Sequence, residues 1–354
     1  MTIEVRANGR RYTGWKQVRI ERGVDRLAGS FALTVADKPW PIRPGDGVEV
    51  RVAGQLAITG WVDRVASSYG AASHEIEVSG RSRTADLVDC CSEASPGQWS
   101  GLTVDKIAAE LAAPFGLKVR LLSAPGEVVP VFSIDQGRRV GEMLEELARS
   151  RGLLATDDPA GAVVLVAPGA ARASGRIERG RNVLAARGEA RLDGRFSRYV
   201  VKAQQPSTDQ IGAEGGARVK ASAEDARVGR YRPLVLTAGR PLGPAAAQEL
   251  VDYEARVRFG RALEASYTLA GWTQPDGRLW TPGELVGVKD DWLRLDGDLL
   301  IAGVAYRFDG NGRRCELRLV RPEAYARPPA EATGATGAAA SSMGGGDFWA
   351  DAGL

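Results

Sequence analysis

Apolar and polar residues alternate over much of the first eighty positions, which is the pattern of a β-strand with one buried face. Phe31, Leu33 and Val35 lie on one side of their segment, and the residues between them lie on the other. The same period recurs in further short segments, at 3–6, 17–21, 48–52 and 74–79. A period of two indicates half-buried strands, so the pattern predicts a β-rich N-terminal region.

The segment 40–65, WPIRPGDGVEVRVAGQLAITGWVDRV, contains the clearest of these patterns. It begins with a predicted turn, because proline presets its own φ and glycine relieves the crowding where a chain reverses. The turn residues are Pro44, Gly45 and Asp46. One strand follows over 48–52 and a second over 56–65, with Gly60 at the position where we expect a β-bulge or a sharp coil.

A degraded copy of this segment returns at 281–308 as TPGELVGVKDDWLRLDGDLLIAGVAYRF. Its turn residues are Pro282, Gly283 and Glu284, and Gly303 interrupts its returning strand. A turn followed by two coiled strands is half of a small barrel, and closing a sheet removes its exposed edges. The repeat therefore predicts two similar small β-barrels in one chain. The alternative is a coincidence, since proline-glycine-acid turns are common in β proteins.

Three later segments change to the helical period. Thr103 is a candidate N-cap for a helix whose apolar residues are Val104, Ile107, Ala108 and Leu111. Two further helices are predicted at 140–150, where Gly152 ends the pattern, and at 244–261. A short, partly helical segment is expected at 82–90. Strands are expected at 117–122, 153–166, 263–271 and 314–320.

The predicted fold class is therefore α+β, mainly β. The expected domains are 1–89, the first β-barrel; 90–184, an inserted α+β domain; 185–325, the second β-barrel with its helix at about 244–261; and 326–354, a flexible Ala/Gly/Pro tail. Residues 206–230 are rich in Gly, Ala, Ser and charge and show neither period. We expect a long loop there.

Composition indicates a globular protein with ordinary cores. The chain has 354 residues, of which 44% are hydrophobic, and this length suggests roughly two to three domains. Its 47 basic and 44 acidic residues leave a net charge of +3, so composition alone does not demand a polyanionic partner. Cys90, Cys91 and Cys315 match neither a metal-ligand spacing nor a disulfide framework, which favours a reducing compartment. The sequence has no apolar run of signal-peptide or membrane-span length, so we expect no membrane insertion.

Candidates for catalysis are few. His74, the single histidine, opens an alternating strand and is expected to be an exposed strand residue. Asp157 with Asp158, and Asp290 with Asp291, are pairs of the kind that a glycosidase uses. Each pair lies in a turn beside a strand, where aspartate is favoured anyway.

Metal and cofactor signatures are also missing from the sequence. The DGNG segment at 309–312 has part of a calcium-binding loop but lacks the flanking helices and the terminal glutamate, so it predicts a hairpin turn. No phosphate-binding glycine loop joins a strand to a helix. We therefore predict no catalytic, cofactor or metal site and a protein that is not an enzyme.

Arginine is concentrated in the segment 172–202. A phosphate-binding surface has this composition, but so does a solvated connection between domains, or a surface that pairs with a neighbouring subunit's acids. The segment lacks interleaved aromatic residues suited to stacking bases, which weighs against specific nucleic-acid binding.

The order of these features resembles the baseplate hub proteins of contractile phage tails, most closely the hub of Mu-like phages and the late-control D family. More distantly it resembles the T-even hub and the base of VgrG spikes. The resemblance rests on RPGDGVEVRVAG with ITGWVDRV, on LTVDKIAAELAAPFGLKV, on VGEMLEELARSRGLLATDDPAGAVVLV, and on DGRLWTPGELVGVKD with LLIAGVAYRFDGNGRRCELRLVRPEAY. Together these segments span nearly the whole chain as far as Tyr325.

The resemblance implies a structural protein of the virion, assembled in the cytoplasm of the bacterial host. Family hubs are homotrimers whose two barrels per chain alternate around a ring, which joins a sixfold tail tube to a threefold spike. The implied partners are two further copies of the chain, the central spike protein, the tube protein or tube initiator, baseplate wedge proteins and, as a further candidate, the tape measure protein. DNA would only cross the central channel.

The end of the chain gives one more candidate. Phe348 and Trp349 follow a glycine-rich linker, and they are candidates for a tethered anchor onto the spike or another baseplate protein. A tail with no role is the alternative. After Tyr325 no spike domain is recognisable, so we expect the spike to be a separate protein. Two other functions stay open: a VgrG-like component of a type VI secretion or bacteriocin machine, and a tail-associated hydrolase.

Overall fold

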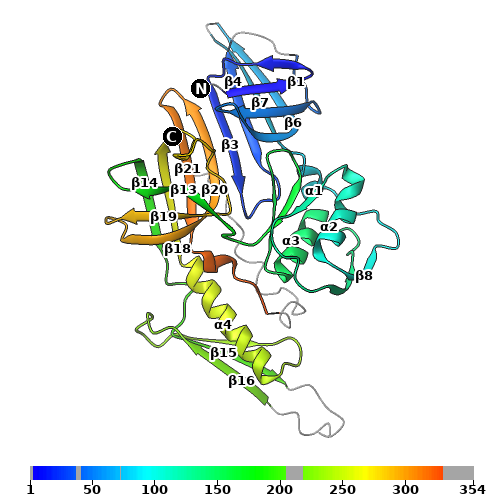
Figure 1. Cartoon of the computed structure of the whole chain (residues 1–354), viewed down its shortest axis with the longest axis vertical. Helices are drawn as coiled ribbons and strands as arrows, with labels where there is room; N and C mark the ends of the chain where they lie inside the picture. Colours follow the sequence, from blue (N-terminus) through cyan, green and yellow to red (C-terminus); the bar gives the residue numbers. More distant parts are fainter. Residues whose placement is uncertain (1–2, 37–40, 72, 205–217, 330–354) are drawn as a thin grey trace. The chain divides into compact units, whose positions relative to one another are not determined.

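The computed structural model describes residues 3–36, 41–71, 73–204 and 218–329. They fall into two compact units, which are described separately (Figure 1). The first unit consists of Met1–Gly194 and Arg256–Arg327, and the second is built on Arg195–Ala255. The predicted tail residues Phe348 and Trp349 lie outside the described residues.

The first half of the large unit is a set of antiparallel strands formed by the alternating N-terminal sequence. The strands are β1 (Ile3–Ala7), β2 (Arg10–Tyr12), β3 (Gln17–Gly23), β4 (Ser30–Ala36), β5 (Gly47–Val52), β6 (Gln55–Gly70) and β7 (Ser73–Ser82). They pair in the order β3-β4-β7-β6-β5-β1-β2. Phe31, Leu33 and Val35 are buried as the alternation predicts, and the residues between them are half-buried.

The second half repeats this arrangement with strands from far along the chain. These are β13 (Ala171–Glu178), β14 (Val183–Ala190), β18 (Leu263–Ala270), β19 (Glu284–Asp290), β20 (Leu295–Asp309) and β21 (Gly312–Val320). Their order is β14-β18-β21-β20-β19-β13, which matches β3-β4-β7-β6-β5-β1 strand for strand. One direction differs, because β13 runs parallel to β19 whereas β1 runs antiparallel to β5.

Backbone pairing of β3 with β20 joins the two halves. The pairing is antiparallel and runs from Gly23 opposite Gly303 to Val18 opposite Phe308. The result is one 13-stranded sheet with a continuous apolar core that draws residues from both halves. Among the described strands no hydrogen-bonded ring closes in either half, so the two predicted barrels are present as matching halves of one sheet.

An α+β region follows the first half. Its elements are α1 (Ala85–Asp89), β8 (Gln98–Leu102), α2 (Val104–Ala112), β9 (Val119–Leu121), β10 (Val129–Ser133), α3 (Val140–Ser150), β11 (Leu154–Asp157) and β12 (Val163–Val166), with a 3-10 turn at Ala113–Phe115. The predicted apolar faces of α2 and α3 are buried in its core. Thr103 occupies the N-cap position of α2 with an extended backbone, as predicted, although its side chain makes no capping hydrogen bond.

The second unit is a three-stranded sheet packed against a helix. It contains β15 (Arg198–Gln204), β16 (Arg218–Glu224) and β17 (Pro233–Thr237), in the order β16-β15-β17, and α4 (Pro244–Arg261) as far as Ala255. Tyr199, Val201 and Val251 are buried between the two layers. The loop expected over 206–230 is therefore wrong for β16, while 205–217 lie outside the described residues. The apolar positions of β16 are one valine and two alanines, and such small side chains give a weak alternation signal.

Gly60 has a different role from the predicted one. The bulges of β6 fall between Val62 and Arg64 and beside Ala57, not at Gly60. Instead the backbone of Arg81 passes so close that a Cβ on residue 60 would lie 1.8 Å from the Arg81 carbonyl oxygen. Glycine is required there because two backbones touch. At Gly303 the nearest atoms to an added Cβ are 3.5 Å away or more, which is ordinary contact.

These distances predict different costs for the same substitution in the two copies of the motif. Gly60→Ala should destabilise the large unit by about 3 kcal/mol or prevent folding, since the clash is with backbone. Gly303→Ala, the matched control, should change stability by less than about 1 kcal/mol. Urea unfolding followed by circular dichroism measures both, and equal effects would contradict the assigned role of Gly60.

Candidate assembly interface

The repeated turns are the first part of the site, and both copies make the same backbone bond. Gly45 has φ +90° and Gly283 has φ +89°, a region that favours glycine. The Gly45 N–H donates to the Val62 carbonyl at 2.8 Å, and the Gly283 N–H donates to the Ile301 carbonyl at 2.8 Å. One strand position later both returning strands carry a bulge. The two turns thus make the same backbone hydrogen bond and are followed by a bulge at the same place.

The acid that follows each glycine differs in its surroundings. Asp46 is near the surface and accepts hydrogen bonds from the Arg43 N–H at 2.8 Å and from Asn8 Nδ2 at 2.7 Å. Glu284 is buried and accepts from Gln274 Nε2 at 2.9 Å and from Arg278 Nη1 at 3.0 Å. Both acids fix their turns, but Glu284 also holds the preceding loop.

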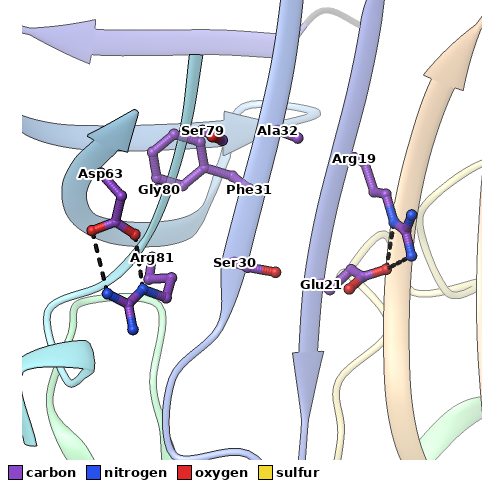
Figure 2. A pocket seen from close by; sticks show the side chains of 9 residues that line it. All are labelled: Arg19, Glu21, Ser30, Phe31, Ala32, Asp63, Ser79, Gly80 and Arg81. Carbon is purple, nitrogen blue, oxygen red and sulfur yellow. Dashed lines mark hydrogen bonds and ion pairs between the residues drawn. The ribbon is translucent and has the colours of Figure 1, made fainter. Parts of the chain in front are cut away.

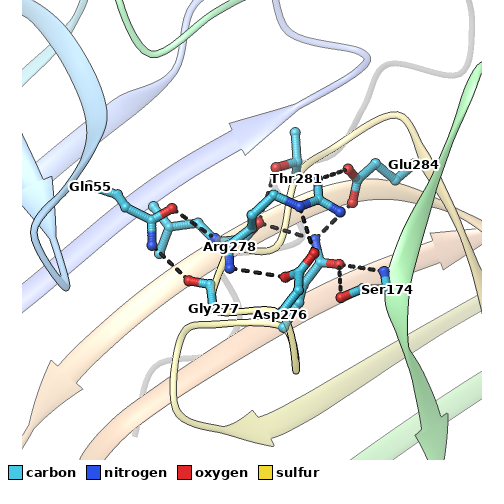
Figure 3. Close-up of polar contacts among 9 residues, drawn as sticks. Gln55, Ser174, Asp276, Gly277, Arg278, Thr281 and Glu284 are labelled. Carbon is cyan, nitrogen blue, oxygen red and sulfur yellow. Dashed lines mark hydrogen bonds and ion pairs between the residues drawn. The ribbon is translucent and has the colours of Figure 1, made fainter.

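That loop connects the two halves of the sheet (Figure 3). Gln55, at the start of β6, donates from Nε2 to the Gly277 carbonyl at 2.8 Å and accepts from the Leu279 N–H at 3.3 Å. Arg278 also donates to Asp276 at 2.7 Å, while the Gln274 amide oxygen accepts from the Ser174 N–H at 2.7 Å. Sequence reasoning missed Gln55, since a single polar residue in a hairpin gives no signal.

A buried tyrosine lies within the β3–β20 pairing, and an ion pair lies beyond one end of it. Tyr306 is 1% exposed and its hydroxyl donates to the Trp280 carbonyl. Burial raises the pKa of this phenol well above its usual range, so it stays protonated and acts as a donor. Beyond the last paired residue, Arg318 donates to Asp25, and the Val24 N–H donates to the Ala302 carbonyl at 2.9 Å.

A buried ion pair ties the sheet to the α+β region. Arg22 on β3 and Asp157 on β11 are 7% and 1% exposed, with Arg22 Nε 3.3 Å from Asp157 Oδ1. The other carboxylate oxygen accepts from the Gly29 N–H at 3.2 Å, and Arg22 also donates to the Asp157 carbonyl at 2.5 Å. Sequence reasoning treated Asp157 as a turn residue, so its partner 135 positions away was missed.

The described residues also contain one shallow pocket, on the β3, β4 and β7 side of the first half (Figure 2). Its charged groups are already paired. Arg81 donates to Asp63 at 2.8 Å and to Asp89 at 2.7 Å, and Arg19 pairs with Glu21. Hydrogen bonds to Asp89 and Asp63 raise the pKa of Arg81 further. Figure 2 shows Asp63 and Arg81 facing each other beside Phe31. The charged side chains that line the pocket are therefore paired with one another.

The other candidates for chemistry have structural contacts. His74 stacks on Tyr69 at the exposed end of the β6–β7 hairpin, with ring centroids 6.3 Å apart. Asp158 accepts from Arg120 at 2.9 Å. Asp290 accepts from the Tyr267 hydroxyl at 3.1 Å, and Asp291 pairs with Arg179 at 2.9 Å.

The hairpin predicted at 309–312 is confirmed. β20 ends at Asp309 and β21 begins at Gly312, and these two residues pair. Among the described residues no group of three or more His, Cys, Asp or Glu side chains could hold a metal ion. Within the same residues no helix is long and apolar enough to cross a membrane.

The arginine-rich segment divides between ion pairs and an exposed sheet face. Arg172, Arg179 and Arg195 pair with Asp298, Asp291 and Asp225 respectively. Arg198 and Lys202 lie on the exposed face of β15, opposite Glu224 and Lys220 of β16 respectively. Three arginines of the segment therefore connect distant elements, while Arg176, Arg181 and Arg191 pair with acids two or three positions away.

Three family models match the chain along its length. Residues 2–82 match the Mu phage baseplate assembly protein GpP-like N-terminal domain, and 84–167 match the second domain of baseplate hub protein gp44-like. Residues 243–328 match the fourth domain of Mu phage baseplate assembly protein GpP. The first two boundaries coincide with the sheet half and the α+β region described above.

Solved structures share the fold. A 43 kDa tail protein of prophage MuSo2 from Shewanella oneidensis is 33% identical with a TM-score of 0.84, covering 93% of this chain and 100% of that one. A tail protein from Neisseria meningitidis is 25% identical with a TM-score of 0.77, covering 94% and 98%. An E. coli component of the type VI secretion system has a TM-score of 0.57 at 11% identity and shares the fold alone.

The duplicated sheet and the similarity to solved tail proteins together show that the chain is a structural protein of a phage-type tail. The baseplate hub protein gp44 of Escherichia phage Mu is 33% identical over 340 residues, covering 92% of this chain and 89% of that protein. The chain belongs to the family of Mu-like baseplate hub proteins, and as a phage tail baseplate component it is located in the virion.

The buried ion pair leads to a stability prediction. Asp157→Asn should destabilise the protein by about 3 kcal/mol, because it leaves the Arg22 guanidinium buried without a countercharge. Asp298→Asn, which breaks the exposed pair with Arg172, is the matched control and should cost less than about 1 kcal/mol. Urea unfolding measures both variants. Equal effects would show that the Arg22 pair is not essential to docking the α+β region.

Proposed function

We propose that three copies of the chain form a baseplate hub ring with pseudo-sixfold symmetry. The observation that carries the proposal is the duplication, since each chain contributes two sheet halves with the same strand order and the same turn bond. Three chains around one axis would place six similar halves in a circle. Such a ring fits a sixfold tail tube on one face and a threefold spike on the other.

The proposed ring surrounds the channel that DNA crosses. Its partners are the central spike protein, the tube protein or tube initiator, wedge proteins and, as a further candidate, the tape measure protein. We propose assembly in the host cytoplasm before incorporation into the tail. The candidate anchor at Phe348 and Trp349 is part of this proposal, as the segment that would tether the spike or another baseplate protein.

The two alternatives have less support. A VgrG-like role is supported by a shared fold at 9–11% identity with type VI proteins, against 33% identity with a phage hub. A tail-associated hydrolase would need a pair of carboxylates that face a cleft. The carboxylates of Asp157 and Asp158 instead hold Arg22 and Arg120.

The mass in solution tests the proposal. Light scattering coupled to size exclusion should give about three times the chain mass of 37.6 kDa, either for the purified chain or once the spike protein of the same particle is added. Samples at several concentrations control for aggregation. A chain that stays monomeric in both conditions would contradict the ring, and binding to a polyanion instead would favour a nucleic-acid role.

A further inference from the structure

Among the described strands of the large unit, two of the unpaired edges correspond by the repeat to the strands that pair at the β3–β20 junction. The correspondence starts from the shared turn bond, which makes Val62 equivalent to Ile301. Counting along the ladders from there makes Val78 on β7 equivalent to Leu317 on β21, and Leu33 on β4 equivalent to Tyr267 on β18.

The first unpaired edge belongs to β14, the counterpart of β3. Arg19 lies opposite Ala32 on β4, and Arg187 lies opposite the equivalent Ser266 on β18. The same count makes Glu189 equivalent to Glu21, so the sequence Arg-x-Glu recurs at matching positions. The sequence analysis did not identify this repeated Arg-x-Glu. Among the described strands, β3 pairs with β4 and β20, whereas β14 pairs with β18 alone.

The second unpaired edge is the segment 64–69 of β6, the counterpart of the β20 residues that pair with β3. On its β7 side this segment is fully paired, from Arg64 opposite Ser79 to Tyr69 opposite His74. On its other side the pairing of β6 with β5 reaches no further than Trp61, opposite Gly47 at the start of β5. No described strand therefore pairs with that edge.

Residues at the two unpaired edges are more exposed than their counterparts at the junction, as expected for strands that lack a partner. Val18 and Ile20 on β3 are 3% and 0% exposed, while most of β14 is exposed and Leu184 is 59% exposed. Phe308 on β20 is partly buried against the core, while its counterpart Tyr69 on β6 is 87% exposed. An exposed edge strand with apolar side chains is a ready template for pairing with another chain.

We infer that β14 of one copy pairs antiparallel with β6 of the next copy, in the register that β3 and β20 adopt within the chain. This inference rests on the proposed ring and supplies its contact between copies. In the register carried over, Tyr69 of one copy lies opposite Ala186 of the next, and Ser68 opposite Arg187. The contact uses two different surfaces, so it is head-to-tail and closes into a ring at three copies.

Side-chain chemistry agrees with this register on both faces of the strands. On the core-facing side the exposed ring of Tyr69 meets the small Ala186, where the chain's own junction pairs Phe308 with Val18. On the other side Arg187 approaches Glu77, the counterpart of Glu316. At the existing junction the charge of Arg19 acts on Glu316 in the same way.

Directed cross-linking tests the register. In a Cys90→Ser, Cys91→Ser background, which removes the exposed thiols, Tyr69→Cys with Ala186→Cys should form disulfides between copies on mild oxidation. Denaturing gels should show covalent dimers and trimers and nothing larger. Tyr69→Cys with Arg187→Cys is the matched control, since neighbouring residues of a strand point to opposite faces and this pair should not link.

Charge reversal gives an independent readout. Arg187→Glu should weaken the trimer at least tenfold by light scattering, because it faces Glu77, and adding Glu77→Arg should restore part of the affinity. A trimer without the 69–186 cross-link, or with equal linking in the control, overturns the inference and leaves the proposed ring standing. A monomer without cross-links, alone and with the spike protein, overturns both.

Discussion

Backbone pairing between β3 and β20 is the constraint on which the large unit depends. By pairing residues that lie between 280 (Gly23 and Gly303) and 290 (Val18 and Phe308) positions apart, it converts two sheet halves into one sheet with one apolar core. Because β3 is also bound to the α+β region through Arg22 and Asp157, a single strand fixes three parts of the unit to one another. Contacts of such long sequence separation are entropically costly to form, so they need this density of backbone bonds and buried side chains.

Duplication explains much of the sequence, and the departures from it are equally informative. Gly45 and Gly283 are equivalent because both turns need a positive φ. Gly60 and Gly303 both occur in the returning strand of the motif, but only Gly60 is needed for a close backbone contact. A Cβ at residue 60 would clash with the Arg81 backbone, whereas a Cβ at residue 303 would make ordinary contacts. Asp46 stays at the surface, while Glu284 is buried with Gln274 and Arg278. Each copy has kept the backbone path and adapted its side chains to a different neighbour.

The sequence predicts most of what depends on local period and little of what depends on distant partners. The helices at 140–150 and 244–261, the strand at 31–35 and both turns follow from spacing and turn chemistry alone. β16 and β17 were missed because the alternation of apolar and polar residues is weak in them and in the residues around them. In addition, the apolar face of their sheet is buried by packing against α4. The pairing of β3 with β20 was missed for a different reason. No local sequence pattern specifies which distant strand will pair with the free edge of β3.

The composition of β14 shows how an unpaired edge can exist in a stable chain. Its outward residues include Arg187 and Glu189, and charged side chains on an edge discourage indiscriminate pairing. Its core-facing residues are Ala186 and Gly188, where β3 has the larger Val18 and Ile20. Leu293 lies 3.1 Å from where a Cβ on residue 188 would lie, so a larger side chain at this position would have to displace it. The edge thus offers backbone groups to a matching strand while exposing less apolar surface than its counterpart would. In the proposed ring, that balance would favour pairing with a strand of the matching register over indiscriminate pairing.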